Sequence, residues 1–304
     1  MITIVYRELS SLVSDLDFSA KTLYSVSNRI SYHYRTVLLP KGGGEFRRLS
    51  VPDPLLKAIQ RKILAVLLPL EPISVYAAAY RPAGSTRINA APHVGKPVIL
   101  ELDIKRFFDS IIYSLVKEKA FPSQRYSERN RILLAILCTL DDALPQGAPT
   151  SPAISNIIMR EFDNTIGHWC ADRKIAYTRY CDDMTFSGDF DTAPVVAFVR
   201  SELGKLGLFL NERKTAVIHS GQRQCVTGIV VNEKVSGPKE YKRKIRQEMH
   251  YCLKYGVDSH LEKMDRSCER DIYVSSLLGR ISYVLSVEPD NPEMKRYRQM
   301  LKSI

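Results

Sequence analysis

Residues 175–188 read IAYTRYCDDMTFSG and contain two adjacent aspartates, Asp182 and Asp183. The apolar and β-branched residues on either side of this pair fit a pleated, half-buried surface and predict a β-hairpin with both carboxylates at or near its turn. Adjacent ionised carboxylates repel each other, so this placement requires a compensating cation. Mg²⁺ supplies one, because it prefers oxygen ligands and shares its coordination shell with substrate phosphates. An ordinary β-turn is the alternative, since Asp is common in turns.

A second segment, residues 98–109 (VILELDIKRFFD), reads as a buried apolar strand that ends at Asp103 and is followed by an aromatic pair. If the strand lies beside the hairpin, Asp103 adds a third carboxylate from a distant point in the sequence. Two metal ions about 3.5–4 Å apart, held by such carboxylates, can clamp the attacking and leaving oxygens of a phosphoryl displacement. The three aspartates are therefore candidate catalytic residues and metal ligands.

These two segments resemble the catalytic motifs of reverse transcriptases. Residues 180–183 (YCDD) match the Tyr-x-Asp-Asp box of that family, and residues 102–104 (LDI) with Phe108 match its first palm motif. Three further matches follow in the family's order and cover nearly the whole chain. They are a fingertip strand with basic residues at 46–52 (FRRLSVP), the loop that opens the helix behind the incoming nucleotide at 144–152 (LPQGAPTSP), and a late palm motif with a lysine near the triphosphate at 211–215 (NERKT).

Two more elements resemble one branch of the family, the retron reverse transcriptases of bacteria. Residues 89–93 (NAAPH) are similar to the Asn-Ala-x-x-His element of retron enzymes, and residues 225–231 (CVTGIVV) contain their Val-Thr-Gly element. The small length of 304 residues also fits this branch, and we expect no ribonuclease H, protease, integrase or endonuclease domain. Cys181 stands where many bacterial relatives carry Ala, and either small side chain can pack under a turn. The chain is therefore identified as a retron-type bacterial reverse transcriptase.

The resemblance implies an α+β fold, the right-hand polymerase, with fingers, an antiparallel-sheet palm and a small helical thumb. We expect fingers and palm to interleave over residues 1–237, with the palm mainly at 98–110 and 145–237, and the thumb to occupy 238–304. The local patterns predict a fingers hairpin within 34–51 that turns around glycines 42–44. They also predict helices at 54–68, within 114–140, and at 152–173, 193–206, 239–255 and 270–287, with further palm strands near 208–210, 216–219 and 224–231.

The composition is that of a globular protein with a polyanionic partner. The formal charge is +11 and the pI about 9.3, and a basic excess of this size favours nucleic acid, where phosphate neutralisation releases counterions. The N-terminus lacks the pattern of a secretory signal, and the longest apolar stretches are too short to span a bilayer. The six cysteines have no zinc-like spacing. We therefore expect a cytoplasmic protein with reduced thiols and no membrane partner.

The resemblance assigns roles around the metal site. Asp103 and Asp182 are expected to bridge two Mg²⁺ ions, for which Mn²⁺ can substitute, while Asp183 is the more peripheral ligand. Ile104, next to Asp103, is included in the metal site. Lys214 either donates a proton to the departing pyrophosphate or neutralises it, although its neighbour Arg213 could fill the same role.

Other candidates surround the nucleotide. The family places an aromatic residue beneath the sugar at Phe108, where the ring would clash with a ribose hydroxyl and so select deoxynucleotides, but Phe107 and Phe108 could also be core residues. The glycine of Gln146-Gly147 permits close approach of the backbone to a ligand, unless the loop is an ordinary helix entry. Arg47 and Arg48 are candidates for the triphosphate, since guanidinium groups bind phosphate oxygens in a fork. Because alternate residues of a strand face opposite sides, we expect only one of them to point inward.

The implied reaction is RNA-templated DNA synthesis from deoxynucleoside triphosphates. In the retron branch a structured noncoding RNA serves as template and primer, and synthesis starts from a 2′-hydroxyl of that RNA, which joins the RNA to its DNA product. Such systems resemble antiphage defence modules with a separate effector protein. We expect contacts to RNA phosphates and 2′-hydroxyls from the basic thumb helix and the Val-Thr-Gly element, and either a structural or an RNA-contacting role for the Asn-Ala-x-x-His element. The RNA-binding candidates are Asn89, His93, Val226, Thr227, Gly228, Lys239, Lys242, Arg243, Lys244 and Arg246.

Three alternatives share part of this pattern. Another bacterial reverse transcriptase, of the group II intron-like or diversity-generating class, would keep the palm and use a different RNA. An RNA-dependent RNA polymerase would share the palm but would not favour deoxynucleotides. A non-enzymatic RNA-binding scaffold would not depend on the three aspartates.

Overall fold

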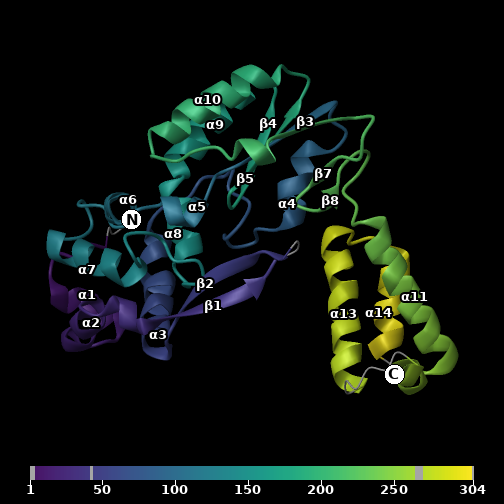
Figure 1. Ribbon diagram of the computed structural model, residues 1–304, viewed down its shortest axis with the longest axis horizontal. Coiled ribbons are helices and arrows are strands. Elements are labelled where there is room, and N and C mark those ends of the chain that lie inside the picture. The colour runs from purple at the N-terminus through teal and green to yellow at the C-terminus, as the bar shows by residue number, and fades with distance from the viewer. Residues whose placement is uncertain (1–3, 42–43, 264–269, 303–304) are drawn as a thin grey trace. The chain divides into compact units, whose positions relative to one another are not determined.

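The computed structural model describes residues 4–41, 44–263 and 270–302 (Figure 1). Two compact units divide the chain: the first comprises Met1–Ala83, Leu100–Phe186 and Phe190–Val217, and the second comprises Gly84–Ile99, Ser187–Asp189 and Ile218–Ile304. Gly42 and Gly43 of the predicted glycine turn lie outside the described residues, as does Cys268. Four of the remaining cysteines are buried and Cys225 is partly exposed, and all five carry free thiols.

The first unit contains the predicted fingers hairpin. Its strands β1 (Tyr34–Pro40) and β2 (Phe46–Pro52) pair antiparallel along their whole length. Asp53 then caps helix α3 (Pro54–Lys62), because its carboxylate accepts a hydrogen bond from the backbone N–H of Leu56. The single helix expected at 54–68 instead changes its winding after Lys62, first to a π-turn and then to a 3₁₀ turn at Leu68–Leu70.

Helices supply much of the apolar core of the first unit. Where one helical region was expected at 114–140, two helices form, and the helix expected at 152–173 is divided in two at Met159. Buried leucine, isoleucine and phenylalanine side chains from these helices join those of the palm strands in one continuous apolar cluster. The helices are α1 (Leu9–Leu16), α2 (Ala20–Ser27), α6 (Tyr113–Lys119), α7 (Glu128–Cys138), α8 (Ser151–Ile158) and α9 (Arg160–Ala171).

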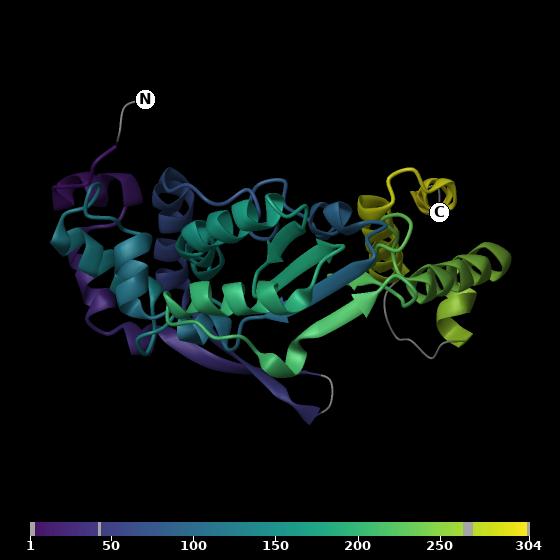
Figure 2. The same cartoon turned by 90° about the horizontal axis from the view of Figure 1, so that it is seen from above.

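A four-stranded sheet carries the aspartate motifs (Figure 2). Its strand order is β4-β5-β3-β6, with bounds Ala176–Tyr180 for β4, Asp183–Gly188 for β5, Val98–Asp103 for β3 and Ala216–His219 for β6. The hairpin predicted around the Asp-Asp pair is thus formed by β4 and β5, and the strand of Asp103 lies next to it. Helix α9 packs on β4 and against α10 (Thr192–Gly204), where Trp169 stacks on Phe198 with ring centroids 4.9 Å apart.

Two predicted palm strands do not join this sheet. Leu210 makes an isolated antiparallel bridge to Ile104. The segment near 224–231 forms its own two-stranded hairpin from β7 (Cys225–Val226) and β8 (Ile229–Val230). This hairpin packs on helix α4 (Thr86–Ala90) in the second unit, where Ala90, Val226 and Ile229 are fully buried together. Burial against α4 rather than sheet pairing therefore fixes this segment.

The C-terminal part of the second unit is a helical bundle. Helices α11 (Lys239–Tyr255) and α13 (Arg270–Val287) begin and end at the predicted residues, and α12 (Val257–Lys263) and α14 (Pro292–Lys302) complete the bundle. Apolar side chains of α11 and α13, among them Ile245, Met249 and Leu277, form its core with Met294 of α14. Among the described residues, no helix is long and apolar enough to cross a membrane.

Candidate active site

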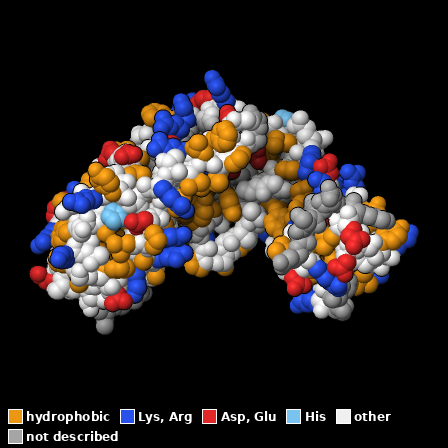
Figure 3. Space-filling view, turned by 60° about the horizontal axis from the view of Figure 1, so that its bottom comes forward, with side chains coloured by type: hydrophobic (Ala, Val, Ile, Leu, Met, Phe, Trp, Pro, Cys, Tyr) orange, Lys and Arg blue, Asp and Glu red, His pale blue; other side chains and the backbone are white. Residues whose placement is uncertain are grey.

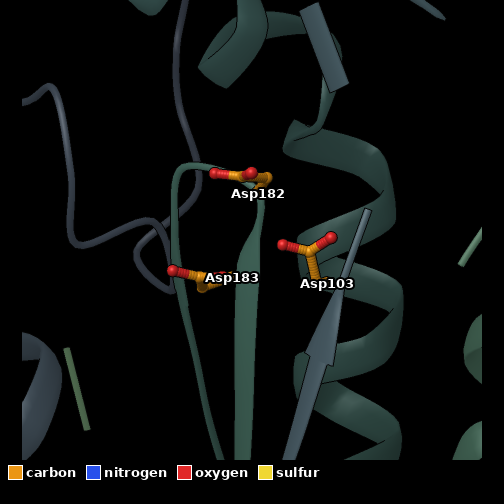
Figure 4. Close-up of side chains that lie close together, drawn as sticks. All are labelled: Asp103, Asp182 and Asp183. Atoms are coloured by element: carbon orange, nitrogen blue, oxygen red, sulfur yellow. The ribbon is translucent and has the colours of Figure 1, made fainter. Parts of the chain in front are cut away.

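Strand ends bring three carboxylates together (Figure 4). Asp103 is the last residue of β3, and Asp182 and Asp183 stand at the turn between β4 and β5. One carboxylate oxygen of each lies within 4.8 Å of the others. The backbone N–H of Ile104 donates to the carbonyl of Asp182 at 3.1 Å, which fastens the strand end to the turn. The structure therefore gathers the three aspartates that the sequence motifs single out, with the backbone of Ile104 beside them.

The charge of this cluster is only partly balanced by protein groups. Lys214 donates from Nζ to Oδ2 of Asp103 at 2.6 Å, and Asn211 donates from Nδ2 to Oδ1 of the same carboxylate at 2.9 Å. The hydrogen bond to Asp103 raises the pKa of Lys214, which keeps this side chain charged. Desolvation of its carboxyl group, with the nearby charges of Asp182 and Asp103, raises the pKa of Asp183 to about 6. A further cation would relieve the repulsion that these shifts report.

The donor set fits a hard divalent ion. All three side chains offer carboxylate oxygens, which Mg²⁺ and Mn²⁺ accept, and the group contains no histidine or cysteine. Asp103 is buried, Asp182 is half-buried and Asp183 is exposed, so the cluster opens toward solvent on one side. An ion held here would keep coordination positions for phosphate oxygens.

A cavity of about 870 Å³ adjoins the cluster, and its walls belong to the first unit. Residues of β2 line it together with the ends of β3 and the β4–β5 turn. Arg47 and Arg48 both line this cavity, and which of the two guanidinium groups points inward stays a prediction. This end of β2 is exposed on both faces. Arg48 lies 3.5 Å from the hydroxyl of Thr36 on β1.

The two phenylalanines after β3 have different environments. Both line the cavity. Phe107 is 3% exposed and belongs to the main apolar core, whereas Phe108 is half-buried and packs at the edge of that core. Their rings are 5.4 Å apart. Both side chains therefore contribute to packing, and Phe108 is the more exposed of the two.

The Pro-Gln-Gly loop is attached to the fingers hairpin. Its Gln146 lines the cavity and accepts a hydrogen bond at its backbone carbonyl from the N–H of Ser50 on β2, at 2.8 Å. Gly147 has a φ of 121°, and a Cβ atom on it would lie 2.8 Å from the carbonyl oxygen of Ser50. The glycine is thus required by close approach to β2, where the sequence suggested close approach to a ligand.

The two retron-like elements meet in the second unit. Asn89 of the first element donates to the hydroxyl of Thr227 in the second at 3.4 Å. His93 is fully buried and lies 2.7 Å from the hydroxyl of Ser187, and its burial, with the charge of Lys96, lowers its pKa to about 4. Asn89, His93 and Val226 are closed off from solvent. Thr227 and Gly228, at the β7–β8 turn, remain accessible.

The basic residues of α11 fall into two groups. Lys239, Arg243 and Lys244 are exposed, whereas Lys242 is largely buried and pairs with Glu288 at 2.7 Å. Arg246 is exposed but pairs with Glu293 at 2.8 Å. Figure 3 shows Lys and Arg side chains on the surfaces of both units. Of the predicted RNA contacts on this helix, the exposed group is the one available to a polyanion.

Some residues of the site were not singled out from sequence. Asn211 lies within the NERKT segment, and its position three residues before Lys214 could have identified it as a second partner of Asp103. Tyr80 lines the cavity with a φ of 56°, and no local motif marks it. Arg179 precedes the Tyr-x-Asp-Asp box and is fully buried. Arginine side chains are seldom fully buried, so the sequence gives no reason to expect this.

Comparisons with known proteins were made for the whole chain. The sequence model of one protein family, described as reverse transcriptase (RNA-dependent DNA polymerase), matches residues 39–251. The chain is 32% identical to the retron Mx65 reverse transcriptase of Myxococcus xanthus, over 86% of this chain and 63% of that one. It is 29% identical to the retron Ec86 reverse transcriptase of Escherichia coli, over 93% and 86%, and 30% identical to the retron Ec83 reverse transcriptase of the same species, over 92% of each.

A solved structure shares the fold. The apo telomerase from Candida tropicalis aligns with a TM-score of 0.50 over 94% of this chain and 64% of that one, with 13% sequence identity. At this level of identity the likeness concerns the fold alone. It agrees with the α+β right-hand architecture expected from the sequence.

Proposed function

Because the chain belongs to the reverse transcriptase family and, within it, to the retron enzymes, we propose that it copies a cognate structured noncoding RNA into DNA. RNA-directed DNA polymerisation is the activity of this family. The observation that carries the proposal is the convergence of Asp103, Asp182 and Asp183 beside a cavity that is also lined by Phe108 and Gln146. Deoxynucleoside triphosphates are the proposed substrates, and the cavity is large enough to admit one.

The metal site would be occupied by two Mg²⁺ ions, or by Mn²⁺ in their place. Asp103, Asp182 and Asp183 are the residues that would hold them, with the backbone of Ile104 beside Asp182. Bound there, the ions supply positive charge to the attacking primer hydroxyl and to the leaving pyrophosphate. Lys214 is held by Asp103 and stays protonated, so it can neutralise the pyrophosphate or give it a proton.

The remaining cavity residues would orient the nucleotide. Arg47 and Arg48 both reach the cavity and can bind triphosphate oxygens through their guanidinium groups. Phe108 would lie beneath the sugar and exclude a ribose 2′-hydroxyl, while Gln146 is held in place through its backbone bond to Ser50. Catalysis of this kind depends mainly on positioning and charge stabilisation.

The partner RNA is proposed to be both template and primer, with synthesis starting from one of its 2′-hydroxyl groups. Retron relatives of similar length support this assignment. In the second unit the exposed residues Lys239, Arg243, Lys244 and Gly228 and the partly exposed Thr227 are the proposed RNA contacts. Asn89 supports the Val-Thr-Gly turn through its hydrogen bond to Thr227, and His93 is buried against Ser187. We place the system in antiphage defence, together with a separate effector protein.

The test is to sequence the nucleic acid that co-purifies with the protein from its native host. A short DNA joined covalently to a structured RNA is expected, and it should be absent from the Asp182→Asn, Asp183→Asn double variant. DNA products without a covalent RNA would favour a group II intron-like or diversity-generating enzyme. An unaffected biological activity of the double variant would favour a non-enzymatic scaffold. Preferential incorporation of ribonucleotides would instead identify an RNA-dependent RNA polymerase.

A further inference from the structure

A buried ion pair lies beneath the catalytic turn. Arg179 of β4 and Asp163 of α9 are both fully buried. The guanidinium group meets the carboxylate with two hydrogen bonds, from Nε to Oδ1 at 2.8 Å and from Nη2 to Oδ2 at 2.6 Å. Tyr177, two residues earlier on the same strand, donates its hydroxyl to Oδ1 of Asp163 at 2.9 Å. None of these three side chains lines the cavity, so they have no contact with a nucleotide held there.

The same guanidinium group also binds the turn itself. Nη1 of Arg179 donates to the backbone carbonyl of Cys181 at 2.8 Å. This carbonyl belongs to the peptide that joins Cys181 to Asp182, so the orientation of the peptide fixes the position of the Asp182 backbone. Cys181 has a φ of 63°, a left-handed conformation that residues other than glycine seldom adopt and that surrounding contacts must hold. Arg179 supplies such a contact.

Several elements fix Arg179 in turn. Asn156 of α8 accepts from Nη2 at 3.2 Å and donates to the carbonyl of Ala79 at 2.8 Å. The backbone of Arg179 is bound on both sides, because its N–H donates to the carbonyl of Tyr76 and its own carbonyl accepts from the N–H of Ala78. A buried charge is stable only when its hydrogen bonds are satisfied, and the donors of this guanidinium are engaged by a carboxylate, an amide and the turn. The group is therefore rigidly placed.

We propose that Arg179 is a positioning residue for the polymerase reaction. It transmits the fixed positions of α8 and α9 to the Cys181–Asp182 peptide and thereby holds Asp182 and Asp183 at the separation from Asp103 that divalent ions require. This inference rests on the proposed function, since it gives the turn a task in metal binding. The alternative is that Arg179 only stabilises the fold. In that case any substitution that removes as much buried hydrogen bonding would change metal binding to the same extent.

Two substitutions separate these roles. Arg179→Lys keeps a positive charge beside Asp163. It removes the guanidinium group, which binds Asp163 and the Cys181 carbonyl simultaneously. Tyr177→Phe is the matched control, because it removes a buried hydrogen bond to the same carboxylate from the same strand and leaves the turn carbonyl untouched. Thermal unfolding measures stability, and electron paramagnetic resonance of added Mn²⁺ measures metal binding without any need for turnover.

Both variants are expected to lose thermal stability. Arg179→Lys should in addition weaken Mn²⁺ binding by about 10–100-fold, as loss of outer ligand-orienting groups does, and raise the Mg²⁺ concentration for half-maximal DNA synthesis in parallel. Tyr177→Phe should bind Mn²⁺ like the wild type. Equal Mn²⁺ affinity in the two variants would overturn the inference. A wild-type protein that binds Mn²⁺ yet makes no DNA on its RNA would instead overturn the proposed function alone.

A second variant covers the case in which Arg179→Lys does not fold. Asn156→Ala removes the amide that accepts a hydrogen bond from Nη2 of Arg179. It leaves the residues of the ion pair with Asp163 and of the hydrogen bond to the Cys181 carbonyl unchanged. It should still lower Mn²⁺ affinity relative to Tyr177→Phe, by less than Arg179→Lys would. Unchanged affinity in Asn156→Ala would contradict the proposed transmission from α8 to the turn.

Discussion

Asp183 links the candidate metal site to pH. Desolvation and the charges of Asp182 and Asp103 raise its pKa from 3.8 to about 6 in the folded protein. A carboxyl group with a raised pKa favours folding while protonated, so this contribution is full below about pH 4 and is lost as the pH rises through about 6. Without divalent ions, Asp183→Asn should therefore be more stable than the wild type above pH 6, by about 1 kcal/mol because water screens the exposed group. Urea unfolding across pH 4–8 measures the difference.

The control for this prediction is the same titration with Mg²⁺ present. The wild type should then gain stability at pH 7.5, because a bound cation removes the repulsion, whereas Asp183→Asn should gain less. A wild type whose stability is independent of Mg²⁺ and of pH between 4 and 8 would contradict the assignment of Asp183 to the metal site.

Residue types with a strong chemical signature could be identified from sequence, and residues defined by tertiary contacts could not. The Asp-Asp pair and Asp103 follow from carboxylates placed at the ends of apolar strands, and the structure brings them within reach of one ion. Arg179 has no such signature, because its importance comes from burial against a helix that precedes it in the chain. Arg47 and Arg48 both line the cavity at an exposed end of β2. The alternation of side chains along a strand does not indicate how much of that strand other segments bury.

At the scale of single segments, the Pro-Gln-Gly loop offers a test of whether its close approach to β2 supports nucleotide binding. Gly147 combines a φ of 121° with a would-be Cβ contact of 2.8 Å to the Ser50 carbonyl, so Gly147→Ala must displace either the loop or β2. We expect a loss of about 2–3 kcal/mol of unfolding free energy. The KM for deoxynucleotides should rise, because Gln146 and the β2 arginines would no longer be held together, while Mn²⁺ binding should be unchanged. Steady-state kinetics and urea unfolding provide the readouts.

Gly204→Ala in α10 is the matched substitution, since nothing lies within 4 Å of the added methyl group and the residue is helical. It should leave the KM unchanged and be neutral or slightly stabilising. Equal KM values for the two alanine variants would show that the loop is not coupled to nucleotide binding.

Element boundaries were predictable where local sequence decides them. Helices α11 and α13 matched their predicted bounds, and the β1–β2 and β4–β5 hairpins formed as expected. The break at Met159 and the separate β7–β8 hairpin were not predicted. The β7–β8 hairpin depends on packing against α4, and periodicity within one segment carries no information about such a partner.

For the whole molecule, the basic excess is expected to serve RNA binding through particular surfaces. Lys239, Arg243 and Lys244, which are exposed on α11, are the proposed phosphate contacts. Replacing all three by Gln should weaken binding of the cognate RNA and reduce the slope of log affinity against log salt concentration by about 2, because each phosphate contact contributes about 0.7–0.9. Filter binding at several salt concentrations measures both quantities.

Helix α14 offers a control with the same change in net charge. Its Arg296, Arg298 and Lys302 are also exposed, and they belong to the same helical bundle. If α11 forms a defined RNA surface, the α14 triple Gln variant should keep a salt slope close to that of the wild type, because a lost charge far from phosphate releases no counterion. Equal reductions in the two triple variants would mean that the RNA responds to the total charge of the bundle, and the assignment of α11 as its binding surface would then be wrong.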